Sequence, residues 1–353
     1  MVAPAQRPRP ILRADRGTSS STTTDLAELP GLAPLVGNTP LLHLGSLSRQ
    51  AGLPIYAKAE WTNPGGSVKD RPARHILLDA LSRGELGPAR PGRRLLDATS
   101  GNTGIAYATL APSFDISVTL CLPGNASRER QQILKALGTE LILTDPLEGS
   151  DGAIVKAQEM AQADPERYHH VDQYANDANW RAHYETTGPE IWAQTYGRIT
   201  HFVAGLGTTG TLVGTSRSLK DRDPKVQAIA VGPDGPFHGL EGLKHLDTAI
   251  VPEIWDATAP DRVLEVATEP AQGMVRRLAQ EEGLLVGPSG GAAALASLLL
   301  AKELAEEGGY SRIAPDEPVP SVRNTPPGTP VVVTLFPDNA SKYLSSPFWE
   351  EGV

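Results

Sequence analysis

The sequence has little cysteine, no excess of basic residues and no long apolar run. Its single cysteine, Cys121, excludes intramolecular disulfide bonds and a cysteine-rich metal site, which is typical of a reducing, cytoplasmic compartment. No window approaches about 18 consecutive apolar residues, so we expect no membrane-spanning helix. With 32 Lys and Arg residues against 41 Asp and Glu residues, the formal net charge is −9. Because no basic stripe is available to neutralise a phosphate backbone, a nucleic acid partner is not expected.

The chain has 353 residues, 40% of them hydrophobic, which is enough to bury the cores of two domains. Residues 1–30 are rich in Arg, Pro, Ser and Thr and lack hydrophobic periodicity, so we expect a disordered extension. Its early arginines leave a transit peptide open as an alternative, although three prolines oppose the amphipathic helix of such a peptide. Six prolines between about residues 311 and 330 predict a surface loop.

Apolar β-branched runs alternate with helical patterns along the chain, which predicts an α/β fold with a mostly parallel sheet and helices on its faces. The clearest unit runs from the strand ISVTLCL (116–122) through a helix at 127–137 to the strand ELILT (140–144). Gly138 stands where a helix-terminating glycine is expected. Ligands of such folds bind in the loops at the carboxyl ends of the strands.

Three such loops are rich in small and hydroxylated residues. The loop ATSGNTG (98–104) precedes a helical run, and the exposed backbone N–H groups at the start of a helix suit a carboxylate or phosphate. A simple N-cap turn without a ligand is the alternative. The loop GLGTTGT (205–211) resembles a cradle for one small phosphate, because it lacks a P-loop lysine and the dinucleotide spacing; a turn without a ligand is the alternative. The loop GPSGGAAALA (287–296) places Ser289 between an expected strand LLV (284–286) and an Ala-rich helix, where it could also serve only as a cap.

A fourth motif, NPGGSVKDR (63–71), places Lys69 behind two glycines and a serine. A lysine in such a turn is usually a solvated surface charge. Together with VGNTPLL, HYETTGPEIW and KYLSS, however, the four motifs resemble, in this order, the fold type II pyridoxal phosphate enzymes of the cysteine synthase and cystathionine β-synthase group. The segment HYETTGPEIWAQTYGRITHFVAGLGTTGTLVG is most similar to the cysteine synthase B branch, and the resemblance covers about residues 34–300 and the last strand.

The resemblance implies two open, twisted, mostly parallel sheets flanked by helices, similar to the β subunit of tryptophan synthase. The cofactor pyridoxal 5′-phosphate is then expected between an N-terminal domain (31–165), which carries the cofactor lysine and a mobile subdomain at about 98–145, and a C-terminal domain (166–353). A homodimer is also implied.

The resemblance also assigns roles to single residues. Lys69 matches the lysine that binds the cofactor covalently and transfers the α-proton. The implied cofactor-binding residues are Lys69, Asn102 beside the 3′-oxygen, Gly207, Thr208, Thr209, Gly210 and Thr211 around the phosphate, and Ser289 at the pyridine nitrogen. The implied substrate-binding residues are Thr99, Ser100, Gly101, Asn102, Thr103 and Gln173 for the α-carboxylate, and Lys244 in the acceptor loop.

The implied reaction is β-replacement on O-acetylserine or O-phosphoserine, with sulfide or thiosulfate as nucleophile, through an aminoacrylate intermediate to L-cysteine or S-sulfocysteine. A different nucleophile in specialised metabolism and a non-catalytic relative are the alternatives. Lys244 stands where the cysteine synthase B branch carries an arginine, so it is interpreted either as an anion receptor or as a surface lysine. Pro288, Gly290 and the closing PDNASKYLSS depart from the family pattern and leave the specificity open.

A metal site is not expected. His169 and His170 are adjacent, and neighbouring residues of a strand point to opposite faces, so one ion cannot easily use both.

Overall fold

The computed structural model describes residues 28–99, 101–308 and 320–350. The predictions made for most of the N-terminal extension, for the first part of the proline-rich loop and for Ser100 lie outside the described residues.

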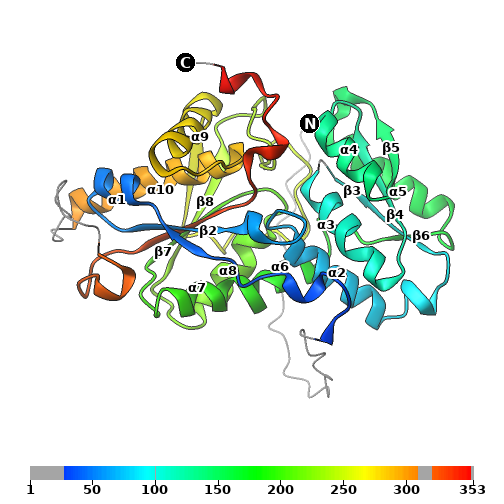
Figure 1. Cartoon of the computed structure of the whole chain (residues 1–353), viewed down its shortest axis with the longest axis horizontal. Coiled ribbons are helices and arrows are strands. Elements are labelled where there is room, and N and C mark those ends of the chain that lie inside the picture. The colour runs from blue at the N-terminus through cyan, green and yellow to red at the C-terminus, as the bar shows by residue number, and fades with distance from the viewer. Residues whose placement is uncertain (1–27, 100, 309–319, 351–353) are drawn as a thin grey trace, which may run out of the picture.

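The larger of two sheets has six strands in the order β1-β2-β10-β7-β8-β9 (Figure 1). Only β1 is antiparallel to its neighbour, and the other pairs are parallel. β10 is buried along its whole length, which follows from its apolar sequence VVTLF and its central place between β2 and β7. The strands are β1 (Leu41–His43), β2 (Ile55–Ala59), β7 (His201–Gly205), β8 (Gln227–Pro233), β9 (Arg262–Val266) and β10 (Val332–Phe336).

Helices cover both faces of the larger sheet. Ile55 and Ala57 of β2 belong to the apolar cluster beneath one helical layer, whereas Tyr56 belongs to the cluster on the opposite face, as the two-residue period of a strand requires. The first layer consists of α1 (Gly45–Ala51), α9 (Thr268–Glu282) and α10 (Pro288–Glu307). The second consists of α6 (Asp177–Ala182), a π-helical turn His183–Thr187, α7 (Gly188–Gln194) and α8 (Gly210–Lys220).

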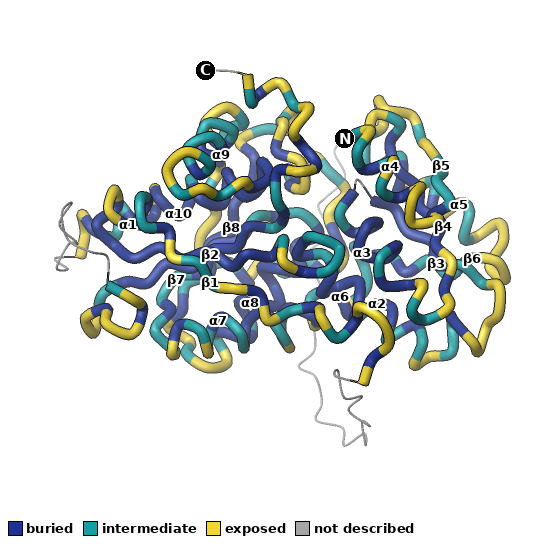
Figure 2. The backbone as a smooth tube through the Cα atoms, viewed as in Figure 1, coloured by how far each residue is buried: buried dark blue, intermediate teal, exposed yellow. Residues whose placement is uncertain are grey.

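The smaller sheet has four parallel strands in the order β5-β4-β3-β6. They are β3 (Arg94–Ala98), β4 (Val118–Pro123), β5 (Glu140–Thr144) and β6 (Tyr168–His170). One face packs on α5 (Gly149–Ala163), and the other on α3 (Asn102–Leu110) and α4 (Arg128–Ala136), with α2 (Asp70–Ser82) packed behind α3. Strands β2 and β10 of the larger sheet and β4 of the smaller sheet are buried along their whole length, whereas the edge strands β1, β5 and β9 are partly exposed (Figure 2).

Short 3₁₀ helices connect these elements at Ala33–Leu35, Glu60–Thr62, Gly87–Ala89, Ala111–Phe114, Pro146–Glu148, Val322–Asn324, Ala340–Lys342 and Pro347–Trp349.

The prediction of two mostly parallel, helix-flanked sheets is confirmed. The strand expected at LLV is wrong, because only Val286 pairs there, in an isolated bridge with Asn339. In the larger sheet β1 pairs with β2, and β2 pairs with the C-terminal strand β10; in the smaller sheet β6 pairs with β3. The domain boundary at residues 165 and 166 stays a prediction. Within the described ranges no helix is both long and apolar enough to cross a membrane.

Candidate active site

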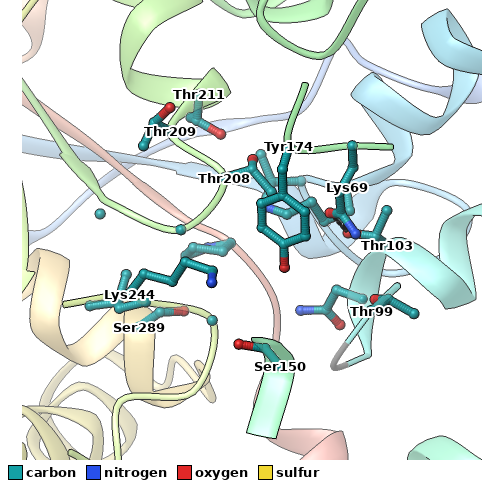
Figure 3. A pocket seen from close by; sticks show the side chains of 18 of the residues that line it. Lys69, Thr99, Thr103, Ser150, Tyr174, Thr208, Thr209, Thr211, Lys244 and Ser289 are labelled. Carbon is teal, nitrogen blue, oxygen red and sulfur yellow. Dashed lines mark hydrogen bonds between the residues drawn. The ribbon is translucent and has the colours of Figure 1, made fainter. Parts of the chain in front are cut away.

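A cavity of about 120 Å³ opens between the two sheets, at the carboxyl ends of their strands. Figure 3 shows Lys69, Thr99 and Thr103 on one side of it, Lys244 and Ser289 on the other, and Tyr174 between them. Of the predicted site residues, those that line this cavity are Lys69, Thr99, Asn102, Thr103, Gln173, Gly207, Thr208, Thr209, Thr211, Lys244 and Ser289. Gly101 and Gly210 lie in the same loops without lining it, and Ser100 is not described.

Lys69 immediately precedes α2, and the structure fixes its backbone from two sides. The Val68 N–H donates to the Pro337 carbonyl at 2.8 Å, and the Lys69 N–H donates to Ser67 Oγ at 3.2 Å. Pro337 follows β10, a fully buried strand between β2 and β7, so the lysine is anchored to the interior of the larger sheet. Its side chain points into the cavity (Figure 3).

Burial lowers the pKa of the Lys69 ammonium from 10.5 to about 8, against the opposing charges of Asp338 and Glu60. With this pKa, roughly a tenth of the amine is neutral at pH 7, and the fraction rises toward pH 8. Only the neutral form can attack a carbonyl carbon or accept a proton. The site thus holds a lysine that is suited to covalent binding of an aldehyde and to proton transfer.

A buried ion network lies behind Lys69. Arg71 donates to Glu60 at 2.7 Å and to Glu190 at 2.7 Å, and Lys58 approaches Glu190 at 2.8 Å. The Arg71, Lys58 and Glu60 side chains are fully buried. Despite its burial, the pKa of Glu190 falls to about 2, because Arg71 and Lys58 bind its carboxylate. The network ties the start of α2 to β2 and α7, and so fixes the position of Lys69.

The loop between β7 and α8 contains two glycines, Gly207 and Gly210, where its backbone lies too close to neighbouring residues for a side chain. A Cβ atom at Gly207 would lie 2.4 Å from the Gly242 carbonyl oxygen, and one at Gly210 would lie 2.2 Å from Asn179 Oδ1, so glycine is required at both positions. Thr209 precedes α8 with φ of 70°, a conformation that non-glycine residues rarely adopt away from functional sites.

The same loop offers unused polar groups to a ligand. Thr209 Oγ1 and Asn179 Oδ1 are buried and have no hydrogen-bond partner among the described residues. Thr208 accepts from Asn179 Nδ2 at 3.1 Å, and Thr211 lies 3.2 Å from His183 Nε2. Burial lowers the pKa of His183 well below its ordinary value, so the imidazole is neutral. N–H groups at a helix start and free hydroxyls fit one phosphate group.

The loop between β3 and α3 forms the opposite wall. Thr99 Oγ1 accepts from the Gly101 and Gly104 N–H groups at 3.1 and 3.3 Å, which closes a tight turn. Thr103 Oγ1 donates to Gln173 Oε1 at 2.7 Å, and Gln173 Nε2 donates to the Ala98 carbonyl at 2.6 Å. These bonds fix the turn, and the Thr99 hydroxyl, which acts only as an acceptor in them, keeps its proton for a ligand such as a carboxylate.

Asn102 is held by two residues, Asp338 and Lys342, to which the sequence analysis assigned no role. Its Nδ2 donates to Asp338 Oδ2 at 2.8 Å, and its Oδ1 accepts from Lys342 Nζ at 2.7 Å. Tyr343 also donates to Asp338 Oδ2, at 2.8 Å. All three partners lie in the closing segment PDNASKYLSS, whose departure from the family pattern was the available signal. This cluster joins α3 of the smaller sheet to the end of β10.

Ser289 and Lys244 complete the far wall. Ser289 is the second residue of α10, whose start at Pro288 is fixed by the hydrogen bond from the Gly287 N–H to the Asp338 carbonyl. Lys244 is buried rather than a solvated surface residue, and its Nζ lies 3.0 Å from Asp151 Oδ1. Sequence reasoning missed Asp151, as well as Tyr174 and Ser150 of the lining.

The described residues contain no group of three or more His, Cys, Asp or Glu side chains that could hold a metal ion. His169 approaches Glu85 and His170 approaches Asp97, each at 4.0 Å, so the two histidines have separate partners.

A reactive amine, a cradle for one phosphate and a turn for one carboxylate, placed around a single cavity between two parallel sheets, define an enzyme that uses a phosphorylated aldehyde as cofactor and an amino acid as substrate. Comparisons with known proteins agree with this class.

A family model described as pyridoxal-phosphate dependent enzyme matches residues 32–314. The cysteine synthase of Aquifex aeolicus is 48% identical over 320 residues, which cover 90% of this chain and 91% of that protein. The cysteine synthase B of Pseudomonas aeruginosa is 43% identical over 278 residues, 78% of this chain and 91% of that protein. The crystal structure of O-acetyl serine sulfhydrylase isoform 3 from Entamoeba histolytica superposes with a TM-score of 0.77 at 30% identity, covering 98% of this chain and 97% of that one.

The chain belongs to the pyridoxal-phosphate dependent enzymes, in the group of the cysteine synthases. Its cofactor is pyridoxal 5′-phosphate.

Proposed function

We propose that the protein replaces the acetoxy group of O-acetyl-L-serine by sulfide, forming L-cysteine and releasing acetate. The observation that carries this proposal is the single cavity into which the Lys69 amine, the loop before α8 and the loop before α3 all open. The names of the cysteine synthase relatives and of the O-acetyl serine sulfhydrylase from Entamoeba histolytica support the product and the leaving group.

Lys69, Asn102, Ser289 and the loop at 207–211 would hold the cofactor. When bound, pyridoxal phosphate supplies an electron-accepting ring that acidifies the α-proton of an amino acid and allows a β-substituent to leave. With the cofactor bound, Ser289 would offer the ring nitrogen a neutral hydroxyl instead of a carboxylate. This moderates the electron demand of the ring and favours β-replacement over transamination.

Lys69 acts as general base and acid. Its neutral amine removes the proton from Cα of the substrate, the acetate departs from Cβ, sulfide bonds to Cβ, and the Lys69 ammonium returns the proton to Cα. A pKa of about 8 suits both directions of this transfer near neutral pH. The anchoring of Val68 to Pro337 keeps the amine in place while the substrate changes.

The turn Thr99–Thr103, with Gln173, orients the substrate by its α-carboxylate. We propose that binding there draws the subdomain at about 98–145 toward the larger sheet and excludes water. Two contacts across the cavity support such a closure. Arg130 of α4 forms an ion pair with Glu241, and Glu129 accepts a hydrogen bond from Ser345 at 2.7 Å.

The first experiment is a visible absorption spectrum of the purified enzyme before and after addition of O-acetylserine without sulfide. The cofactor band should shift with O-acetylserine, and cysteine should form once sulfide is added. Lys69→Ala should remove turnover, whereas Lys225→Ala, at an exposed position, should not. An enzyme whose spectrum ignores O-acetylserine and that forms no cysteine would contradict the proposal.

We also propose that the chain acts as a homodimer in the cytoplasm. The resemblance to cysteine synthases supports the dimer, and the single buried thiol of Cys121 suits a reducing compartment. Light scattering of the purified enzyme tests the dimer directly, since a monomer mass would exclude it.

A further inference from the structure

Lys244 is held in the cavity wall by Asp151. Asp151 belongs to α5, the helix that packs on the smaller sheet. Its backbone N–H donates to the Leu206 carbonyl at 2.7 Å, which pins its loop beside the phosphate cradle. Its Nζ lies 3.0 Å from Asp151 Oδ1 and 5.1 Å from the ring centre of Tyr174. Asp151 also accepts from the Ile250 N–H through Oδ2 at 3.2 Å, so both carboxylate oxygens bind the loop that carries Lys244.

The position of this pair relative to the substrate follows from the other walls. The loop before α8 takes the cofactor phosphate, and the turn Thr99–Thr103 takes the α-carboxylate. The substituent on Cβ is then left facing the remaining polar lining, which consists of Arg130, Ser150, Tyr174, Lys244 and Tyr343. Figure 3 shows Ser150, Tyr174 and Lys244 on this part of the cavity. The charge of that wall therefore acts on the leaving group.

The charge of the wall is balanced. Among the described residues that line the cavity, the cations are Lys69, Arg130 and Lys244. Lys69 is committed to the cofactor, Arg130 is paired with Glu241, and Lys244 is paired with Asp151. The Lys244 side chain is only 9% exposed, whereas the Asp151 side chain is 36% exposed, so the cation is buried and water reaches the pair from the carboxylate side.

We propose that Asp151 determines the leaving-group specificity by neutralising Lys244. An acetyl ester is uncharged and fits a neutral wall, whereas a phosphate ester carries a charge of about −1.5 to −2 near pH 7. A phosphate would have to displace the Asp151 carboxylate from Lys244 or lie close to it, and either arrangement costs free energy. The enzyme is thus selective for neutral O-acyl serines, and removal of the Asp151 charge admits O-phosphoserine. This inference rests on the proposed β-replacement.

The test measures kcat/KM of the holoenzyme for O-acetylserine and for O-phosphoserine, with sulfide in both assays. Wild type should prefer O-acetylserine. Asp151→Asn should shift the ratio toward O-phosphoserine by about tenfold or more, since it frees a buried cation for a charge-assisted hydrogen bond. The shift should disappear in Asp151→Asn/Lys244→Met. Glu159→Gln is the matched control, because Glu159 lies exposed on the same helix and should leave the ratio unchanged.

Asp151→Ser serves as a second variant if Asp151→Asn folds poorly, and cofactor absorption with circular dichroism verifies the fold of each. A ratio within about twofold of wild type in both folded variants would overturn the inference, as would a shift that persists without Lys244. A wild-type preference for O-phosphoserine would also overturn it. These results differ from failure of the proposed function, in which wild type forms no cysteine from either ester.

Discussion

Replacing Lys69 by methionine should stabilise the cofactor-free protein at neutral pH. The structure keeps this ammonium in a poorly solvated cavity, where its pKa falls from 10.5 to about 8. A shift of that size corresponds to about 3 kcal/mol of unfavourable free energy for the protonated form. Because some water reaches the amine through the cavity, we expect Lys69→Met to raise the free energy of unfolding by about 1 to 3 kcal/mol at pH 7.

The gain should depend on pH in a defined way. Below pH 8 the lysine is protonated in both the folded and the unfolded protein, so the full penalty applies. Between pH 8 and 10.5 the folded protein holds a neutral amine while the unfolded chain is still protonated, so the penalty shrinks as pH rises. Urea denaturation of the cofactor-free wild type and Lys69→Met at pH 7 and near pH 10 measures both values.

Lys225→Met is the control, because Lys225 is exposed and should change the free energy of unfolding by less than about 0.5 kcal/mol at either pH. The reasoning would be refuted if Lys69→Met destabilised the protein at pH 7, or if its gain were equally large near pH 10. Either result would mean that the cavity solvates the ammonium as well as bulk water does.

Three further outcomes follow from the site. Glu190→Gln should lower the free energy of unfolding by about 3 kcal/mol at pH 7, because it leaves Arg71 partly unpaired. In acid denaturation the difference in free energy between wild type and variant should shrink as pH falls from 4.5 toward 2, and a pH-independent difference would contradict the ion pair. Gly207→Ala should weaken cofactor binding at least about tenfold in a titration followed by absorbance, since its Cβ would strike the Gly242 carbonyl; unchanged affinity would exclude the close approach. Asp338→Asn should lower the pKa of the cofactor lysine further, so the rate of cofactor reconstitution should begin to rise at lower pH than in wild type; a profile moved to higher pH would contradict this assignment.

Local pattern was sufficient for most of the fold. Strands β4 and β5 and helix α4 lie within one or two residues of the predicted ranges, because their apolar runs and the helix-terminating Gly138 are local signals. The prediction of a strand at LLV (284–286) was wrong, because a run of three apolar residues does not indicate whether a partner strand lies beside it. The position of β2 in the larger sheet depends on its pairing with β10, nearly 300 residues away, and no local signal carries that information.

The residues of the candidate site likewise differ in whether the sequence alone predicts them. Lys69 and the loops at 98–104 and 205–211 could be predicted because each motif is contiguous in the sequence. Asp151, Arg130 and Asp338 could not, because each acquires its place only when the two sheets meet. Charged residues on helices and in terminal segments are mostly solvated, so their sequence context is uninformative until the partner is known.

The central place of β10 has a consequence for biosynthesis. The ribosome makes β10 after the other five strands of the larger sheet, yet β2 and β7 are joined within the sheet only through β10. A nascent chain that has not reached Val332 exposes two apolar strand edges, which are prone to pair with other chains. It also lacks Pro337 and Asp338, which fix the loop of Lys69. The cofactor site can therefore form only after β10 has been inserted between β2 and β7.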